Sequence, residues 1–332
     1  MSAETSATAP QPSRVSRAHW RWVFLAVGIA LLAYVIRTVG PARILATLIG
    51  ASVFMPLIIA GDLAFFICET FAYRAVLGPK VDSIPSGFFA RTALLYYCVM
   101  VLAPLGRMGA EIARAAALSS HVGAGPVTAA ATNMQGGVLL ANCFVSVPAL
   151  VAVIHVVGID HPLSWLLTIN AVGTGVLGLV TLLIVRKSRI GGWLGRRIPR
   201  LAALGADLDA SAVVDRSRLV RSVAFCFAAR LAQIAQYAAL LAAVGATVTL
   251  GGSLVAFGVH LAGAAFGDLV PNQIGIMEGA YQIFADAIGM ADDPARAVSI
   301  ALLSRVSQIV IASTSMFVMA FSKAGTAPST TP

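Results

Sequence analysis

Two glutamates in apolar surroundings are the residues of this chain best suited to bind a charged group. Glu111 lies seven residues after Pro104, and Glu278 lies seven residues after Pro271, each time just beyond a long apolar run. The two copies of the pattern are 167 residues apart in a chain of 332. A carboxylate is costly inside a membrane, so each of these glutamates indicates a site that pairs with a cation or contacts a ligand.

Prolines and glycines around both glutamates predict interrupted helices. Proline lacks the backbone N–H that an interior helix position donates, so Pro104 and Pro271 break the helices that contain them. Four glycines are expected to allow tight turns and close backbone approach: Gly106, Gly109, Gly275 and Gly279. We expect each glutamate to open a short helix, at 112–118 or 280–288, whose N-terminal N–H groups favour an anion. The alternative is that both regions are kinked membrane spans.

Two arginines flank the first glutamate at helical spacing. Arg107 precedes Glu111 by four residues and Arg114 follows it by three, so both side chains can reach it on one helical face. The same arginines are candidates to hold an anionic group. Glu111 and Glu278 would then hold arginines in place or bind an amine.

A third arginine lies in the middle of the last apolar run. Arg305 requires a buried acidic partner there, and Asp268 and Glu278 are the candidates. Structural pairing explains this arginine as well as contact with a substrate does.

Further polar residues share helical faces within the apolar runs. Arg230, Gln233 and Gln236 form one stripe, for which hydrogen bonding between helices is favoured over a functional role. Asp62 and Glu69 are two helical turns apart and are expected to line a cavity. A similar face in a later run consists of Asn133, Gln135 and Asn142.

Composition places the chain in a membrane. Hydrophobic residues make up 58% of the chain and charged residues 11%, and the mean hydropathy is +0.87. A soluble domain has about 25% charged residues, and a membrane-spanning helix needs about 20 apolar residues. Apolar runs recur at 22–36, 44–76, 88–103, 126–157, 163–185, 219–244, 250–270 and 297–321.

The distribution of basic residues selects among topologies. Nine of the 23 Lys and Arg lie in the loop 186–221, which is therefore expected to face the cytoplasm. Eight crossings that start from a cytoplasmic N-terminus place this loop outside and invert the positive-inside rule. If the two Pro…Glu regions are re-entrant hairpins instead, sixteen Lys and Arg lie inside and three lie outside. Eight spans with an external N-terminus remain the alternative, with fourteen inside and seven outside.

The sequence thus predicts an all-α polytopic membrane protein with about six full spans and two re-entrant hairpins arranged as an inverted repeat. Such a pair of broken helices in corresponding halves is typical of transporters. The expected organisation is a disordered tail at 1–18, one transmembrane domain at 19–322, and a second tail at 323–332. The halves of the repeat, 44–185 and 219–322, flank the cytoplasmic loop 186–221, and both termini are expected in the cytoplasm.

Several kinds of chemistry are not indicated. The four cysteines lie in apolar runs without paired spacing, so neither disulfides nor metal binding is expected. No Ser/His/Asp triad or nucleotide-binding motif is found in a suitable context. The basic loop lacks the interleaved aromatic residues of a nucleic-acid-binding module. We therefore expect no enzyme activity, no metal, no cofactor and no nucleic-acid partner.

The two motif regions resemble those of the lysylphosphatidylglycerol synthase transmembrane family, also called flippase-like integral membrane proteins. The stretch 104–114 is similar to the family's Pro…Gly-Glu…Arg motif, and 271–279 is similar to its second Pro…Gly…Glu-Gly motif. Arg305 matches an arginine of the family's last span, and the similarity covers roughly residues 20–322. Near 133–135 the chain departs from the family, which usually has a Glu–Arg pair there.

This resemblance implies a bacterial inner-membrane lipid flippase or transporter without the aminoacyl-transferase domain, and hence without synthase activity. Its partners would be membrane lipids and, in some pathways, a lipid-synthesis enzyme. The expected substrate is an anionic or aminoacylated phospholipid or a hopanoid-type lipid. The alternative is a non-transporting accessory or scaffold protein of an envelope-lipid pathway.

Overall fold

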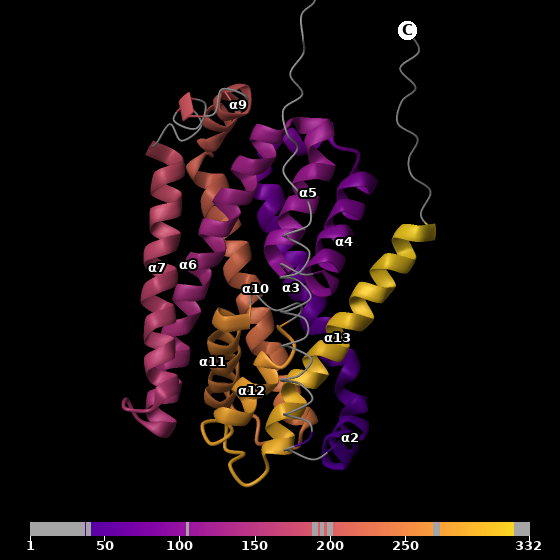
Figure 1. Cartoon of the computed structure of the whole chain (residues 1–332), viewed down its shortest axis with the longest axis vertical. Coiled ribbons are helices and arrows are strands. Elements are labelled where there is room, and N and C mark those ends of the chain that lie inside the picture. The colour runs from indigo at the N-terminus through magenta and orange to yellow at the C-terminus, as the bar shows by residue number, and fades with distance from the viewer. Residues whose placement is uncertain are drawn as a thin grey trace, which may run out of the picture.

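A computed structural model describes residues 37, 41–103, 106–187, 192, 196–197, 202–267 and 273–321. These residues form helices and turns without a β-strand (Figure 1). The α-helices are α2 (Pro41–Gly50), α3 (Met55–Leu77), α4 (Ser86–Leu102), α5 (Gly106–Val122), α6 (Ala124–Val157), α7 (Pro162–Lys187), α9 (Ala202–Ala212), α10 (Arg216–Ala243), α11 (Leu250–Gly267), α12 (Ile276–Ile283) and α13 (Pro294–Phe321). Two 3₁₀ helices, η1 (Ala51–Phe54) and η2 (Gly78–Ser83), flank α3. The predicted terminal tails, the apolar run 22–36, Pro104, Asp268 and Pro271 lie outside the described residues.

Six segments of the described residues are long and apolar enough to cross a membrane. They are 51–83, 124–157, 162–185, 216–243, 250–267 and 294–321. Five of these begin and end within three residues of a predicted apolar run. The prediction of an all-α polytopic membrane protein is therefore confirmed. The predicted hairpins cover 86–118 and 250–288. α11, in the second of them, has the length of a full span, whereas α4, in the first, is shorter, at 17 residues.

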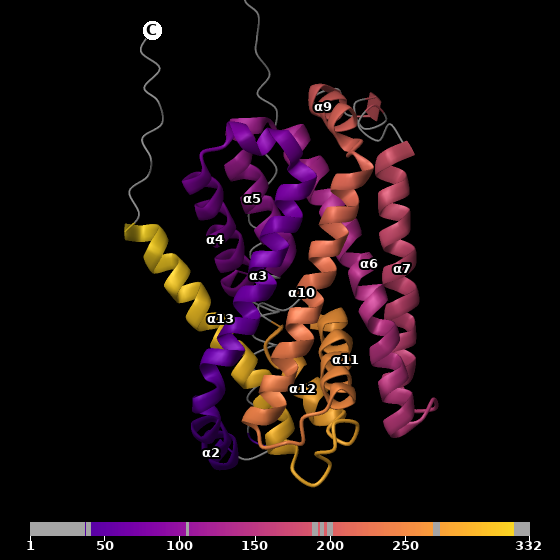
Figure 2. The same cartoon turned by 180° about the vertical axis from the view of Figure 1, so that it is seen from behind.

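The helices of the two hairpin regions lie at opposite ends of the molecule. α4 and α5 pack against each other in the half that also contains α9, while α11 and α12 pack against each other in the other half (Figures 1 and 2). α6, α7 and α10 extend over most of the height of the bundle. Two re-entrant hairpins that enter the membrane from opposite sides must lie at opposite ends of the molecule, as these do. That the two halves of the chain have inverted topologies stays a prediction.

The helix boundaries correct the sequence predictions in three places. The apolar run 44–76 is interrupted at η1, because α3 restarts with Pro56 in its first turn, where a missing N–H costs nothing. The glutamates do not open their helices: α5 starts at Gly106, and α12 covers Ile276–Ile283 instead of 280–288. The loop 186–221 contains the helix α9, and its last basic residues already belong to α10. α10 starts there because the Asp215 side chain accepts a hydrogen bond from the Ser217 N–H.

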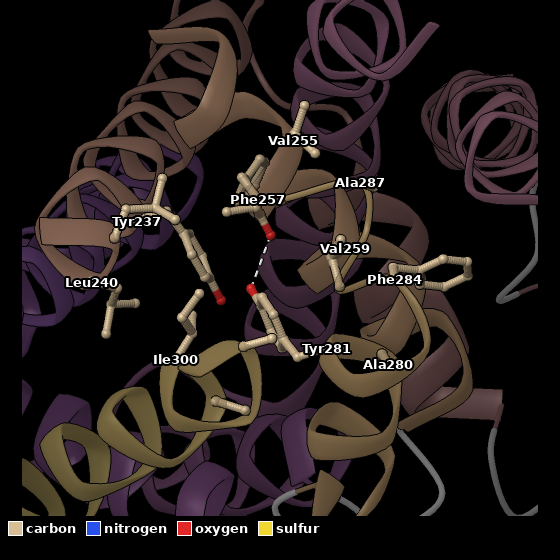
Figure 3. Packing of buried hydrophobic residues seen from close by; sticks show 14 of the residues in the cluster. Tyr237, Leu240, Val255, Phe257, Val259, Ala280, Tyr281, Phe284, Ala287 and Ile300 are labelled. Carbon is tan, nitrogen blue, oxygen red and sulfur yellow. Dashed lines mark hydrogen bonds between the residues drawn. The ribbon is translucent and has the colours of Figure 1, made fainter. Parts of the chain in front are cut away.

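The core between α10, α11 and α12 is built around three buried aromatic residues. Tyr237, Phe257 and Tyr281 lie together at the contact of these helices (Figure 3). The rings of Tyr237 and Tyr281 are stacked with centroids 6.4 Å apart, and the Tyr281 hydroxyl donates to the Ala256 carbonyl at 2.8 Å. This hydrogen bond satisfies a polar group that would be costly to bury alone, and it fixes α12 against α11.

A glycine brings α3 and α10 into close contact. A Cβ at Gly61 would lie 2.6 Å from Cβ of Gln236, so no larger residue fits without moving a helix. At the same contact the Gln236 amide donates to the Ile58 carbonyl at 3.1 Å. Small residues that permit close backbone approach and polar side chains that bond across helices are typical of membrane helix packing. The contact places the charged residues of α3 and α10 side by side.

Candidate functional site

A central cavity of about 310 Å³ lies where the two halves of the chain meet. Its wall includes residues from α3 to α7 and from α10 to α13. Three arginines line it: Arg107 of α5, Arg230 of α10 and Arg305 of α13. The wall also contains the carboxamides of Gln135, Asn142, Asn170, Gln233, Gln273 and Gln308. The cavity is thus rich in hydrogen-bond donors for a site surrounded by membrane-spanning helices.

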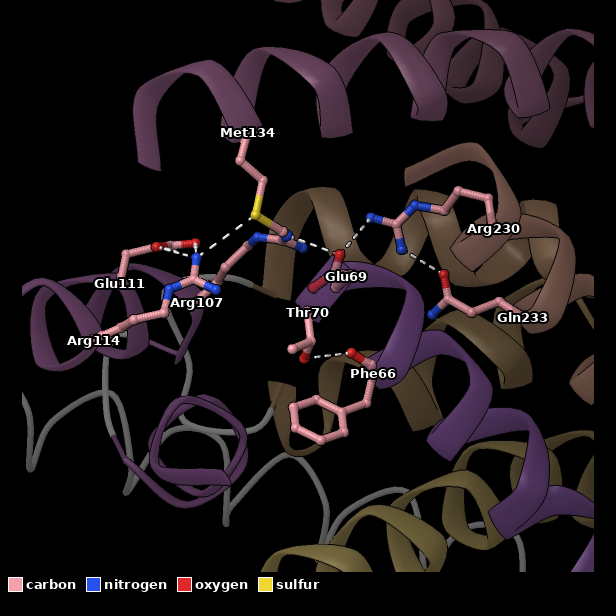
Figure 4. A network of polar contacts seen from close by, with 9 residues as sticks. All are labelled: Phe66, Glu69, Thr70, Arg107, Glu111, Arg114, Met134, Arg230 and Gln233. Carbon is pink, nitrogen blue, oxygen red and sulfur yellow. Dashed lines mark hydrogen bonds and ion pairs between the residues drawn. The ribbon is translucent and has the colours of Figure 1, made fainter. Parts of the chain in front are cut away.

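One carboxylate serves two of these arginines. Oε1 of Glu69, on α3, lies 2.8 Å from Nη2 of Arg107 and 3.7 Å from Nη2 of Arg230 (Figure 4). The Glu69 side chain is 3% exposed, that of Arg230 is 7% exposed and that of Arg107 is 22% exposed. Arg230 also donates to the carboxamide oxygen of Gln233. The shared carboxylate neutralises one guanidinium, and the positive charge of the second is left over.

The third arginine pairs with the second motif glutamate. Nη2 of Arg305 lies 2.8 Å from Oε1 of Glu278, which is fully buried. The other oxygen of Glu278 accepts the Gly275 N–H at 2.8 Å and so caps the start of α12. Of the two partners proposed for Arg305, Glu278 is therefore the observed one. This carboxylate fixes both the hairpin helix and an arginine of the cavity.

Among the described residues, the charges at the cavity do not balance. Three guanidinium groups from this part of the chain line the cavity, and the two carboxylates that pair with them are those of Glu69 and Glu278. Guanidinium groups bind carboxylate and phosphate with several parallel hydrogen bonds and tolerate burial better than an ammonium group. The arrangement therefore suits an anionic group with several acceptor oxygens.

The other predicted pair lies outside this cavity. Arg114 forms an ion pair with Glu111 (Figure 4) and is 4% exposed. Its guanidinium lies over the rings of Tyr73 and Tyr96. Its Cζ atom is 3.6 Å from one ring centroid and 4.2 Å from the other. Arg107, which we expected to reach Glu111, pairs with Glu69 instead. The pair lies within α5, and the contacts of Arg114 with the two tyrosines join α5 to α3 and α4. Neither Arg114 nor Glu111 lines the cavity.

The polar face of α3 is divided between two environments. Glu69 contacts the arginines of the cavity, whereas Asp62 is buried at 3% exposure and accepts a hydrogen bond from Ser307 of α13. Among the described residues, no Lys or Arg nitrogen lies within 4.0 Å of the Asp62 carboxylate. Asn133 likewise bonds to backbone carbonyls, those of Ala129 and Ala212, and does not line the cavity.

The hairpin glycines have different roles. Gly106 and Gly275 adopt positive φ angles, +44° and +80°, which glycine adopts without strain. Gly106 is the first residue of α5, and Gly275 directly precedes α12. A Cβ at Gly279 would meet nothing within 4 Å, so helix packing does not require glycine there.

Several polar residues of the cavity wall were not predicted from the sequence, among them Asn170, Thr174 and Gln273. Asn170 and Thr174 of α7 line it, as does Gln273 at the end of the second hairpin connection. Asn170 and Thr174 are four residues apart in an apolar run, so their helical spacing indicates a common face. Gln273 gives no such signal, because its position depends on the irregular backbone before α12, where its own φ is +53°.

The sequence profile of one protein family, described as the lysylphosphatidylglycerol synthase TM region, matches residues 13–315. The chain belongs to this family. The match includes both hairpin regions and every residue that lines the central cavity. No curated protein and no solved structure matches the chain significantly. Membership in the lysylphosphatidylglycerol synthase TM family, together with the spans described above, makes the chain an integral multi-pass membrane protein with a role related to membrane lipids.

Proposed function

We propose that this protein is a flippase or transporter that moves an anionic amphiphilic lipid across the bacterial inner membrane. The head group would pass through the central cavity while the acyl chains stay in the bilayer. The observation that carries this proposal is the Glu69 carboxylate shared by Arg107 and Arg230, which leaves positive charge at the wall of a cavity in the middle of the bundle.

A lipid head group crosses the membrane slowly by itself because its charge must leave water. A cavity with arginines and carboxamides replaces the hydrogen bonds that the head group gives up. The volume of about 310 Å³ is at the lower end of ligand sites, which measure about 300–1,000 Å³. Such a site is large enough for a head group.

The charges also favour one class of lipid. The two carboxylates that pair with the cavity arginines, Glu69 and Glu278, lie behind them and are already engaged, so neither is free to bind an amine. At the start of α12, Glu278 itself accepts the Gly275 N–H, so the anion would be held by arginine side chains and not by this helix N-terminus. We therefore favour an anionic phospholipid or another anionic amphiphile over an aminoacylated lipid.

The orientation is part of the proposal. We place the end of the molecule with α9 and the loop 186–221 in the cytoplasm, together with both termini, because Lys and Arg concentrate there. The competing function is that of an accessory protein that supports a lipid-synthesis enzyme without moving lipid itself.

The test is a flipping assay with the purified protein in liposomes. A fluorescent phosphatidylglycerol is placed in both leaflets, and a membrane-impermeant reductant quenches the outer leaflet, with and without an imposed proton gradient. We expect quenching to proceed beyond the outer-leaflet share that protein-free liposomes show. Quenching that stops at this share under both conditions would contradict transport and favour the accessory role.

A further inference from the structure

A second hollow, of about 420 Å³, lies where α3 ends and α10 begins, away from the central cavity. We call it the arginine pocket, and its wall includes Phe71, Arg74, Asp82, Arg218, Arg221 and Phe225. We propose that the arginine pocket binds the head group of an anionic phospholipid at the membrane surface. This inference does not depend on the proposed transport, because a lipid can bind there whether or not the central cavity moves one.

The order of residues along both helices matches a membrane interface. On α3, Arg74 follows Phe71 by three residues on the same face and lies nearer the end of the helix. On α10, Arg218 and Arg221 lie near the start and Phe225 one turn further in. Aromatic residues therefore face the hydrocarbon side of the pocket on both helices, and arginines face the aqueous side. Charged and aromatic side chains arrange themselves in this order where a membrane meets water.

The two phenylalanines form the apolar side of the arginine pocket. Their rings are stacked with centroids 5.6 Å apart and planes 26° apart. The Phe71 side chain is 44% exposed on a membrane-spanning helix, so it faces the lipid side of the pocket. A pocket with an apolar side and a cationic side fits a molecule with both characters, whereas a free anion would need only the arginines.

The arginines of the pocket are available for a ligand. Among the described residues, no carboxylate oxygen lies within 4.0 Å of a guanidinium nitrogen of Arg74, Arg218 or Arg221. Among the residues that the structure describes, Asp82 is the acidic residue of the wall, so this part of the pocket has three positive charges and one negative charge. Arginine donors in this excess suit a phosphate diester.

A glycine positions one of these arginines. Gly78 has a φ of +63°, and a Cβ on it would lie 2.5 Å from Nη1 of Arg218. The guanidinium of Arg218 therefore lies directly over the backbone at the end of α3. Because a larger residue at 78 would displace it, the pocket depends on this close approach.

The test uses fluorescence quenching by brominated lipids. A Phe71→Trp reporter is placed in a chain whose own tryptophans, Trp20, Trp22, Trp165 and Trp193, are replaced by phenylalanine. The protein is reconstituted with mixtures of brominated phosphatidylglycerol or brominated phosphatidylcholine, and the ratio of their association constants measures the preference for the anionic lipid. We expect phosphatidylglycerol to be preferred, and each Arg→Gln change at 74, 218 or 221 to lower the preference by up to about fivefold.

Two further variants separate pocket binding from general surface attraction. Arg216→Gln removes the same charge from the same end of α10 but outside the pocket, and it should leave the preference unchanged. Asp82→Asn removes the acidic residue of the wall and should raise the preference. It also keeps the proposal testable if the Arg→Gln variants do not fold.

Three results would overturn the proposal. The first is equal quenching by the two lipids in the parent protein. The second is that Arg216→Gln lowers the preference for phosphatidylglycerol as much as the pocket variants do, or that Asp82→Asn leaves the preference unchanged. The third is loss of the preference on adding inorganic phosphate at a matched ionic strength of sodium chloride, which would identify a site for free phosphate instead of lipid.

Discussion

Nη2 of Arg107 lies 2.8 Å from Oε1 of Glu69 and joins the first turn of α5 to the middle of α3. The same oxygen lies 3.7 Å from Nη2 of Arg230, so three helices meet at one carboxylate. Removing the Glu69 carboxylate leaves two arginines without a counter-charge. Removing one of the two arginines instead leaves Glu69 and the other arginine as a neutral pair. Substitution of Glu69 is therefore expected to destabilise the protein much more than substitution of Arg107.

Removal of the shared carboxylate should destabilise the protein strongly. Glu69→Gln leaves both Arg107 and Arg230 without a counter-charge, and we expect a loss of about 3–5 kcal/mol in the free energy of unfolding. Thermal unfolding of the detergent-solubilised protein measures this loss. The double variant Glu69→Gln/Arg230→Gln should recover part of it, because one of the unpaired charges is gone. No recovery in the double variant would show that the two side chains are not coupled.

A second buried carboxylate should respond in the opposite way. Asp62 has no cationic partner within 4.0 Å among the described residues, and Ser307 donates a hydrogen bond to it. An amide accepts the same hydrogen bond, so Asp62→Asn should keep or raise the unfolding temperature. Ser307→Ala removes the donor from a buried acceptor and should cost about 1–3 kcal/mol. A large loss of stability in Asp62→Asn would point to a cationic partner instead.

The contact between α3 and α10 should tolerate no added methyl group at its closest point. Gly61→Ala places a Cβ 2.6 Å from Cβ of Gln236, and the strain should cost about 1–3 kcal/mol of stability. Gly173→Ala in α7 is the matched control, because a Cβ there meets nothing within 4 Å and alanine favours the helix. The unfolding temperatures of the two variants make the comparison. Equal effects would mean that the helices do not approach as closely as described.

The arrangement of the first hairpin is tested by thiol labelling in a cysteine-free background. Ser83 ends η2 and Ala206 belongs to α9, and Lys80 of η2 donates to Ser211 of α9 at 3.0 Å. Both positions are therefore at one end of the molecule. We expect single cysteines at both to be protected from an impermeant reagent in intact cells and to react after lysis. If the two are labelled from opposite sides, the region 86–118 crosses the membrane and the hairpin is not re-entrant.

Much of the helical architecture can be predicted from the sequence, because a helix that spans a membrane requires a long run of apolar residues. The predicted run 126–157 corresponds to α6 at 124–157, and 297–321 corresponds to α13 at 294–321. Apolar length and proline position determine such boundaries. The start of α5 was harder to predict. The helix begins at Gly106, which has a positive φ, and good helix-forming residues continue it through Glu111. Glu111 therefore lies inside the helix and does not mark its start.

The partners of the charged residues could be predicted only in part. The Arg114–Glu111 pair is local, and its spacing of three residues already indicates it. The Arg107–Glu69 and Arg230–Glu69 pairs join residues that are distant in the sequence, and they depend on which helices pack together. A single sequence shows that each of these charges needs a partner, but the choice of partner is made by the packing of α3, α5 and α10.

The most direct test of lipid transport through the central cavity is the flipping rate of Arg107→Gln in the liposome assay. This variant removes the excess positive charge but leaves Glu69 paired with Arg230, so the protein should stay folded, as size-exclusion chromatography and thermal unfolding would show. We predict a rate for phosphatidylglycerol at least about tenfold below that of the parent protein, since a hydrogen bond to a charged group contributes about 1.5–3 kcal/mol. Arg216→Gln, outside the cavity, should keep the parent rate. A folded Arg107→Gln protein that flips phosphatidylglycerol as fast as the parent would contradict the account.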